Sequence, residues 1–333
     1  MAKRSVFTSV EVCAGAGGQA LGLEQAGFEH LTAVEIDAHA VETLKLNRPN
    51  WRPVKKDLWD FDGREFRGAD LLAGGVPCPP FSIAGKQLGK NDERDLFPRA
   101  LDLIDDINPR AVLLENVRGL ASRKFDEYRA TIIKRLNKQG FEVKWELLNA
   151  CDYGVPQLRP RFLLVALRPE AMKHFKWPAP STDRTNVADV ITDLMEDRGW
   201  PHADEWAKGA ARIAPTVVGG SKKHGGPDLG PTRARREWAT LGVDGRGIAN
   251  EAPGPDFPKA HFPRLTLRMV ARIQGFPDDW KFFGGKTAAY RQVGNAFPPP
   301  VAAAVGAAIR SALVKSSTLK RSIARPIQSR LVA

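Results

Sequence analysis

The sequence has few cysteines and no metal-binding pattern. Three cysteines (Cys13, Cys78 and Cys151) occur in 333 residues, and their spacing is not that of metal ligands or of a disulfide framework. We therefore expect neither a metal site nor structural disulfides. No uninterrupted apolar run approaches the roughly 20 residues that a membrane span needs. The first residues lack the apolar stretch of a secretory signal, so the sequence predicts a cytoplasmic protein without membrane contact.

Positive charge is in excess. The chain has 50 Lys and Arg residues against 38 Asp and Glu residues, which gives a net charge of +12 at pH 7. Such a balance favours a polyanionic partner, and nucleic acid before any other. About half of the excess lies in residues 310–330, where no acidic residue occurs. A basic chain end is equally often only a solvated tail, so the charge supports nucleic-acid binding without deciding it.

The first half of the chain alternates between strand and helix patterns. Short apolar runs at 9–14, 32–34, 71–73, 111–114, 141–145 and 161–166 predict strands, and amphipathic patterns at 19–25, 38–46, 101–107 and 128–138 predict helices between them. This alternation predicts an α/β fold with a doubly wound, mostly parallel, Rossmann-like sheet over residues 1–168. Residues 169–263 are rich in Gly, Pro, Thr and charge, and we expect a second, smaller and irregular domain there.

A glycine turn joins the first predicted strand to the first predicted helix. Gly15, Gly17 and Gly18 would let the backbone turn tightly and approach a ligand closely. Glu35 ends the second strand, where a carboxylate can bind ribose hydroxyls, and Asp57 follows the next strand, within reach of an adenine amino group. Each feature alone is weak, but the three in this order favour an adenosine cofactor.

The same order does not by itself separate NAD from S-adenosylmethionine. The turn lacks the full G-x-G-x-x-G spacing, and no Walker-type Gly-Lys-Ser/Thr sequence is present. Both absences favour an adenosine cofactor without a pyrophosphate.

A cysteine follows the predicted strand at 71–73, within Pro77-Cys78-Pro79-Pro80. Most lone cysteines are small buried hydrophobes, but a proline-rich segment is typical of a stiff surface loop. Glu115 ends another strand at the same sheet edge, and Arg159 and Arg161 open a third. A thiol and a carboxyl group beside an adenosine cofactor indicate covalent catalysis assisted by an acid.

With these blocks the chain resembles the DNA (cytosine-5) methyltransferases, such as bacterial and phage modification methylases. The matching blocks, in family order, are residues 15–18, 77–82, 115–117, 157–161, 264–277 and 290–300. The resemblance implies that Cys78 attacks C6 of a flipped-out cytosine, that Glu115 contacts N3 and the exocyclic amine, and that Arg161 holds O2, with Arg159 assisting near the cysteine. It also implies S-adenosylmethionine as methyl donor.

The resemblance assigns the remaining cofactor residues and the domains. Asn295 matches the family residue near the methionine end of the cofactor. The family has an aromatic residue where this chain has Cys13, and Ile36 can still give the adenine an apolar face. Residues 1–168 would be the catalytic domain, 169–263 the target-recognition domain, 264–314 a return segment that completes the catalytic domain, and 315–333 a basic tail. Cys13 and Cys151 are expected to be packing residues.

The expected substrate is a specific sequence of double-stranded DNA, and the expected state is a monomer, with a cognate restriction endonuclease as a candidate partner. Basic loops at 221–226 and 232–236 could place Arg on guanine edges and Lys on phosphates, or contact phosphates alone. Two alternatives remain open: methylation of RNA, and a catalytically silent DNA-binding relative. The target sequence cannot be deduced from residue types.

Overall fold

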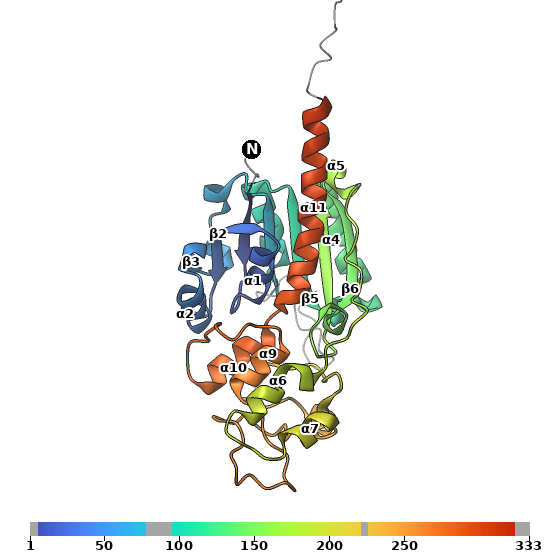
Figure 1. Cartoon of the computed structure of the whole chain (residues 1–333). Helices are drawn as coiled ribbons and strands as arrows, with labels where there is room; N and C mark the ends of the chain where they lie inside the picture. The colour runs from blue at the N-terminus through green and yellow to red at the C-terminus, as the bar shows by residue number, and fades with distance from the viewer. Residues whose placement is uncertain (1–5, 78–94, 221–225, 324–333) are drawn as a thin grey trace, which may run out of the picture.

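The larger body of the protein is built around a seven-stranded sheet. The computed structural model describes residues 6–77, 95–220 and 226–323 (Figure 1). The strand order is β3-β2-β1-β4-β5-β7-β6. Strands β3, β2, β1, β4 and β5 run parallel to one another, while β7 runs antiparallel to both β5 and β6. The predicted mostly parallel α/β sheet is confirmed.

The observed elements lie close to the predicted ones. The strands are β1 (Phe7–Val12), β2 (Phe28–Glu35), β3 (Pro53–Lys55), β4 (Leu71–Gly74), β5 (Ala111–Val117), β6 (Glu142–Asn149) and β7 (Pro160–Leu167). The helices of this half are α1 (Gly18–Gln25), α2 (Ala38–Asn47), α3 (Phe97–Ile107), α4 (Asp126–Lys138) and α5 (Pro169–Met172). Short 3-10 turns connect several of them, including η2 (Leu58–Asp60) and η3 (Gly63–Phe66).

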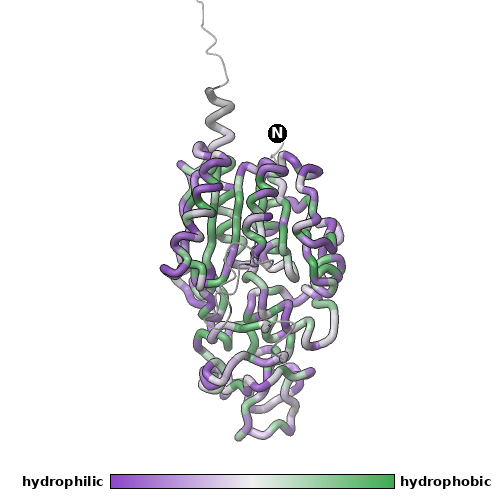
Figure 2. Tube along the Cα trace, turned by 180° about the vertical axis from the view of Figure 1, so that it is seen from behind, coloured by the Kyte–Doolittle hydropathy of each residue, from purple (hydrophilic) through white to green (hydrophobic). Residues whose placement is uncertain are grey.

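Helices cover both faces of the sheet, as the alternation of side chains along a strand requires. Val10 and Val12 of β1 belong to a buried cluster with α3 and α4. Leu71 and Leu113, which point to the other face, belong to a cluster with α1 and α11 (Pro299–Ile323). The strands are correspondingly hydrophobic along most of their length (Figure 2). The sheet is therefore buried on both sides.

Helix α11 lies along α1 and extends beyond the sheet at its far end (Figure 1). By length and composition alone, the stretch Lys286–Thr318 could cross a membrane, but 56% of its most apolar window is buried inside the protein. Val301, Val305 and Ile309 supply much of that burial, on the sheet side of the helix. Packing against the sheet therefore accounts for the apolar character of α11.

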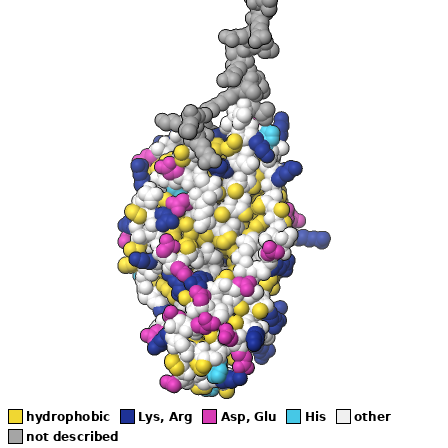
Figure 3. All heavy atoms as spheres, in the orientation of Figure 1, with side chains coloured by type: hydrophobic (Ala, Val, Ile, Leu, Met, Phe, Trp, Pro, Cys, Tyr) yellow, Lys and Arg dark blue, Asp and Glu magenta, His cyan; other side chains and the backbone are white. Residues whose placement is uncertain are grey.

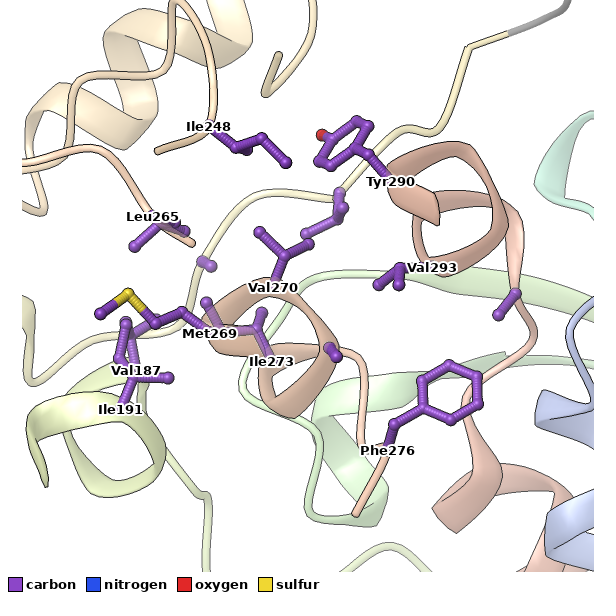
Figure 4. Close-up of a cluster of buried hydrophobic side chains, with 14 of the residues drawn as sticks. Val187, Ile191, Ile248, Leu265, Met269, Val270, Ile273, Phe276, Tyr290 and Val293 are labelled. Atoms are coloured by element: carbon purple, nitrogen blue, oxygen red, sulfur yellow. The ribbon is translucent and has the colours of Figure 1, made fainter. Parts of the chain in front are cut away.

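A smaller, helical body lies beyond the other end of the sheet (Figure 1). It contains α6 (Val187–Glu196), α7 (Ala203–Ala210), α8 (Thr232–Ala239), α9 (Leu267–Ile273) and α10 (Lys286–Asn295). Its core surrounds α9, whose Met269, Val270 and Ile273 pack with side chains of α6 and α10 (Figure 4). In the described residues, α9 and α10 thus pack with this body, whereas α11 returns to the sheet.

Candidate active site

The carboxyl ends of the parallel strands border a cavity of about 780 Å³, which the smaller body closes from the other side. Seven predicted site residues lie on its wall: Gly15, Gly18, Glu35, Ile36, Asp57, Glu115 and Asn295. Cys78 lies outside the described residues, but its chain neighbour Pro77 is part of the wall. The strand ends thus bring together residues that are up to 280 positions apart, from Gly15 to Asn295.

Packing dictates two of the glycines in the turn after β1. Gly17 has a φ of 87°, and a Cβ at this position would lie 2.7 Å from Leu44 Cδ2. A Cβ at Gly18 would lie 2.3 Å from the carbonyl oxygen of Phe297. Any side chain at either position would push α1 away from its neighbours. Gly17 therefore packs the turn against α2, while Gly18 lines the cavity.

The Glu35 carboxylate is held by the backbone around it. Oε2 accepts a hydrogen bond from Gly15 N at 2.8 Å, and Oε1 accepts from Ile36 N at 2.9 Å and from Asp37 N at 2.8 Å. Three N–H donors fix the position of this carboxylate before any ligand arrives. Glu35 also ties the glycine turn to the end of β2.

The part of the cavity next to Glu35 exposes apolar side chains. Ile36 is 60% exposed and Trp59 is 49% exposed, although both lie on the cavity wall. Asp57, between them in the wall, accepts a hydrogen bond from Trp59 N at 3.0 Å. Exposed apolar side chains next to a carboxylate suit a flat heteroaromatic ring with an amino group. Trp59 was not predicted from the sequence.

Two further polar residues of the cavity wall, Glu11 and Gln19, were also not predicted. Both side chains are buried, and within the described part of the chain none of their nitrogen or oxygen atoms has a hydrogen-bond partner. Burial raises the pKa of Glu11 well above its ordinary value. Unpaired buried polar groups are costly and are usually satisfied by a ligand or water. An acid inside an apolar strand, four residues before Gly15, was the available signal.

Cys13 also lies on the cavity wall, in a left-handed conformation with a φ of 51°. Burial raises the pKa of its thiol, and the nearby Glu35 and Glu11 carboxylates raise it further. The thiol is therefore protonated at neutral pH and unsuited to nucleophilic attack.

Glu115 forms a buried ion pair with Arg161 at the other end of the cavity. Arg161 Nε lies 2.8 Å from Glu115 Oε1, and both side chains are about seven-eighths buried. Burial raises the pKa of Glu115, and the guanidinium of Arg161 opposes that rise. A Cβ at Gly75 would lie 3.2 Å from Glu115 Oε2, so the carboxylate contacts the segment that leads to Cys78.

Both ends of the segment 78–94 are fixed next to Glu115. Asn116 Nδ2 donates to the carbonyl oxygen of Val76 at 2.7 Å. Leu96 N donates to the carbonyl oxygen of Pro77 at 3.2 Å, so the residues that flank 78–94 lie side by side. Val76, two residues before Cys78, is thus anchored to Asn116, the residue after Glu115 on β5.

Arg159 is fully buried, and its contacts are with the backbone. Its guanidinium donates to the carbonyl oxygens of Val217 at 2.5 Å, Gly294 at 2.8 Å and Ala296 at 2.9 Å. Next to it, Asn295 Nδ2 donates to the carbonyl oxygen of Gly220 at 3.2 Å. Arg159 therefore joins the start of β7, the segment before residue 221 and the end of α10.

Within the ranges that the structure describes, no group of three or more His, Cys, Asp or Glu side chains could hold a metal ion.

A sequence profile of the C-5 cytosine-specific DNA methylases matches residues 7–311. The chain belongs to this family. It is a DNA (cytosine-5) methyltransferase. Its relatives include the Type II methyltransferase M.NaeI of Lentzea aerocolonigenes, with 56% identity over 91% of this chain and 75% of the relative. M.NgoMIV of Neisseria gonorrhoeae is 52% identical over 93% of this chain and 99% of the relative.

Solved structures of distant methyltransferases share the fold. A DNA modification methyltransferase encoded within an E. coli prophage matches 92% of this chain and 99% of its own, with a TM-score of 0.65 and 21% identity. The Dnmt2 methyltransferase of S. pombe matches 95% of this chain and 99% of its own, with a TM-score of 0.58 and 18% identity. This methyltransferase thus has the fold that its sequence blocks predict.

Proposed function

We propose that this methyltransferase transfers a methyl group from S-adenosylmethionine to C5 of a flipped-out cytosine in a specific double-stranded DNA sequence, through a covalent bond between Cys78 and C6. One observation carries the proposal. A single cavity holds a fixed carboxylate and exposed apolar side chains at one end, and the buried Glu115–Arg161 pair beside the segment leading to Cys78 at the other.

The cavity residues fit S-adenosylmethionine. Glu35 would bind the ribose hydroxyls and Asp57 the adenine amino group, with Ile36 and Trp59 against the ring. The unpartnered carboxylate of Glu11 suits the ammonium group of the methionine part. Gly15, Gly18 and Asn295 would shape the remaining walls, and Gly17 would keep the turn packed against Leu44 of α2. The bound cofactor supplies an electrophilic methyl group.

The protein's own groups prepare the cytosine. The Cys78 thiolate would form a bond to C6, and the C5–C6 π electrons move so that C5 becomes a nucleophile. Glu115, in its protonated form, would donate to N3, and Arg161 would hold O2 as charge develops on the ring. After C5 is methylated, a base removes the C5 proton, and its bonding electrons restore the double bond and expel the thiolate of Cys78. The cytosine must leave the duplex for any of these contacts.

The raised pKa of Glu115 supports its role as a proton donor. Burial raises the pKa of Glu115 above that of an ordinary glutamate, so the carboxylate of the ion pair takes up a proton more readily when the cytosine binds. Arg161 fixes the carboxyl group in place through its Nε and donates Nη1 to the carbonyl oxygen of Pro160. In the described part of the chain its Nη2 has no hydrogen-bond partner, which leaves that group for the substrate.

Arg159 would assist catalysis indirectly. Because its three hydrogen bonds go to backbone carbonyls on the segments around Val217 and Asn295, we assign it to positioning these segments against the base pocket. Residues 169–263 would recognise the target sequence, and 264–314 would return the chain to the catalytic domain. The relatives' description as Type II methyltransferases supports a modification enzyme with a cognate restriction endonuclease. We also propose that it acts in the cytoplasm as a monomer.

Methyl transfer from isotopically labelled S-adenosylmethionine tests this function. Double-stranded DNA and tRNA are each incubated with the protein, digested to nucleosides and analysed by mass spectrometry. We expect labelled 5-methyldeoxycytidine from DNA alone, and bisulfite sequencing of DNA from an expressing host then gives the target sequence. Label in RNA alone would establish the RNA alternative. No transfer to either nucleic acid, with cofactor binding intact, would establish the silent relative.

A further inference from the structure

Several exposed cations of the smaller body are held in ion pairs. Arg233 pairs with Glu237 and Lys259 with Glu205. Basic and acidic side chains are accordingly interspersed over the lower half of the face in Figure 3. Charge alone therefore does not indicate which cation would contact DNA. A cation that reads a base has to be held rigidly and must keep free N–H groups directed outward.

The tripeptide Asp-Gly-Arg holds an arginine in this way. It occurs twice, at 62–64 and 244–246. In both copies the aspartate accepts a hydrogen bond from the arginine backbone N at 3.0 Å. In both, the carboxylate also accepts two hydrogen bonds from the guanidinium, which forms a fork. Nε donates at 2.9 Å and Nη2 at 2.8 Å in Arg64, and Nε donates at 2.8 Å and Nη2 at 3.1 Å in Arg246. The local geometry of the two turns is thus the same.

Only the second copy is braced by the surrounding fold. The Asp244 side chain is 15% exposed, and its Oδ2 also accepts from Arg264 Nε at 3.0 Å. Its backbone N donates to the carbonyl oxygen of Pro263 at 3.0 Å, and the next residue's carbonyl accepts from Leu229 N at 3.0 Å. Asp62, in contrast, is 42% exposed, and Arg64 is its only ion-pair partner in the described ranges. Arg246 is therefore held by a carboxylate that is itself fixed from two sides.

The fork leaves one edge of Arg246 free. A guanidinium has five N–H groups, and Asp244 uses one on Nε and one on Nη2. The other three point away from the carboxylate, and the side chain is 74% exposed. Arg246 lies on the wall of a cavity of about 860 Å³, opposite α8, together with Arg236 and Arg264. The free Nη1–Nη2 edge has the spacing that binds O6 and N7 of guanine with two hydrogen bonds.

We propose that Arg246, held by the Asp244 carboxylate that Arg264 fixes in place, reads a guanine of the DNA target sequence through the major groove. This inference rests on the proposed function, and it names a specificity residue outside the basic loops expected from the sequence. Preorganisation favours base reading, because a rigid fork discriminates between bases, whereas a phosphate accepts a mobile cation in many positions.

The test measures methylation by Arg246→Ala and Arg246→Lys on the target sequence and on every single-base variant of it. We expect Arg246→Ala to lower kcat/KM on the target about 10- to 100-fold and to abolish discrimination at one guanine only. Arg246→Lys keeps the charge but loses the fork, so it should lose the same discrimination. Arg64→Ala is the matched control, and it should leave both rate and discrimination unchanged. Thermal unfolding and cofactor affinity of the variants should equal those of the wild type.

Two outcomes overturn the inference alone. One is that Arg246→Ala lowers the methylation rate equally at all sites and that Arg246→Lys restores it. Together with a salt dependence reduced by about one phosphate contact, this would show that Arg246 contacts a phosphate. Unchanged discrimination in Arg246→Ala would show that the side chain reads nothing. Wild-type protein that methylates no DNA would instead overturn the proposed function first, before any variant is compared.

Discussion

Glu11 of β1 and Glu115 of β5 are buried glutamates on the wall of the same cavity, and they differ in what surrounds the carboxyl group. Burial raises the pKa of both. Glu115 has Arg161 at 2.8 Å, whereas neither oxygen of Glu11 has a partner within the described residues. The base half of the cavity is therefore organised in advance. The cofactor half contains a carboxyl group that only a ligand would satisfy.

The largest effect is expected at Glu115. Glu115→Ala removes the acid that would stabilise charge on the cytosine, so single-turnover methylation should slow about 1,000-fold. The matched control is Glu146→Ala, because Glu146 on β6 and Glu115 on β5 both pair with Leu163 of β7 and Glu146 is exposed. A rate within about tenfold of wild type for Glu115→Ala would remove this residue from the chemistry.

Removing Arg161, the cationic partner of Glu115, should lower the stability of the protein. Arg161→Ala leaves Glu115 buried without its cation, which should lower the free energy of unfolding by about 3 kcal/mol at pH 7. Because Arg161 lowers the pKa of Glu115, its removal raises that pKa further, and Glu115 becomes protonated as the pH falls. The loss should therefore shrink between pH 7 and pH 5 in urea titrations. A loss that is independent of pH would mean that packing, and not the unpaired charge, is responsible.

Glu11→Gln should raise the free energy of unfolding, whereas Arg161→Ala should lower it. The folded-state pKa of Glu11 lies well above its ordinary value of 4.5, so ionising it destabilises the fold at pH values above 4.5. The neutral variant without cofactor should gain about 1 kcal/mol at pH 7 and nothing at pH 4. Its affinity for S-adenosylmethionine should fall about tenfold, because a charge-assisted hydrogen bond is lost.

Calorimetric titration and urea unfolding check both halves of this prediction. Glu29→Gln, at an exposed position on β2, is the matched control and should change neither quantity. If Glu11→Gln bound the cofactor as tightly as the wild type, Glu11 would not be the partner of its ammonium group.

The smallest effect is expected at Cys13. Its thiol has a raised pKa and stays protonated, so it acts as a small apolar wall residue. Cys13→Ala should keep cofactor affinity and methylation rate within about threefold of wild type. If Cys13→Ala lost activity as Cys78→Ala is expected to do, Cys78 would not be the only cysteine in the chemistry.

The sheet and one wall of the cavity could be predicted because the signals are local. Apolar runs that end in Gly15–Gly18, Glu35, Asp57 and Glu115 indicate strands with polar residues at their carboxyl ends, and parallel strands bring such ends together. The six family blocks gave the family itself. These patterns depend on neighbours in the sequence, which the chain displays directly.

The remaining features depend on contacts between distant segments. No local pattern shows that the side chains of Glu11 and Gln19 lie unpaired in the cavity, because that depends on how distant segments pack around the carboxyl ends of the strands. The backbone contacts of Arg159 involve residues near 217 and 295, which no local pattern connects. The two Asp-Gly-Arg turns are identical in sequence, and only long-range contacts, with Arg264, Pro263 and Leu229, distinguish them.

Covalent trapping tests the central claim most directly. The protein is incubated with S-adenosylmethionine and DNA carrying 5-fluorocytosine at the target position, where fluorine cannot leave as the proton does. We predict an adduct stable to denaturation, with the DNA attached to the peptide containing Cys78, and no adduct for Cys78→Ser. An adduct that survives Cys78→Ser, or none on a site that the wild type methylates, would contradict the account.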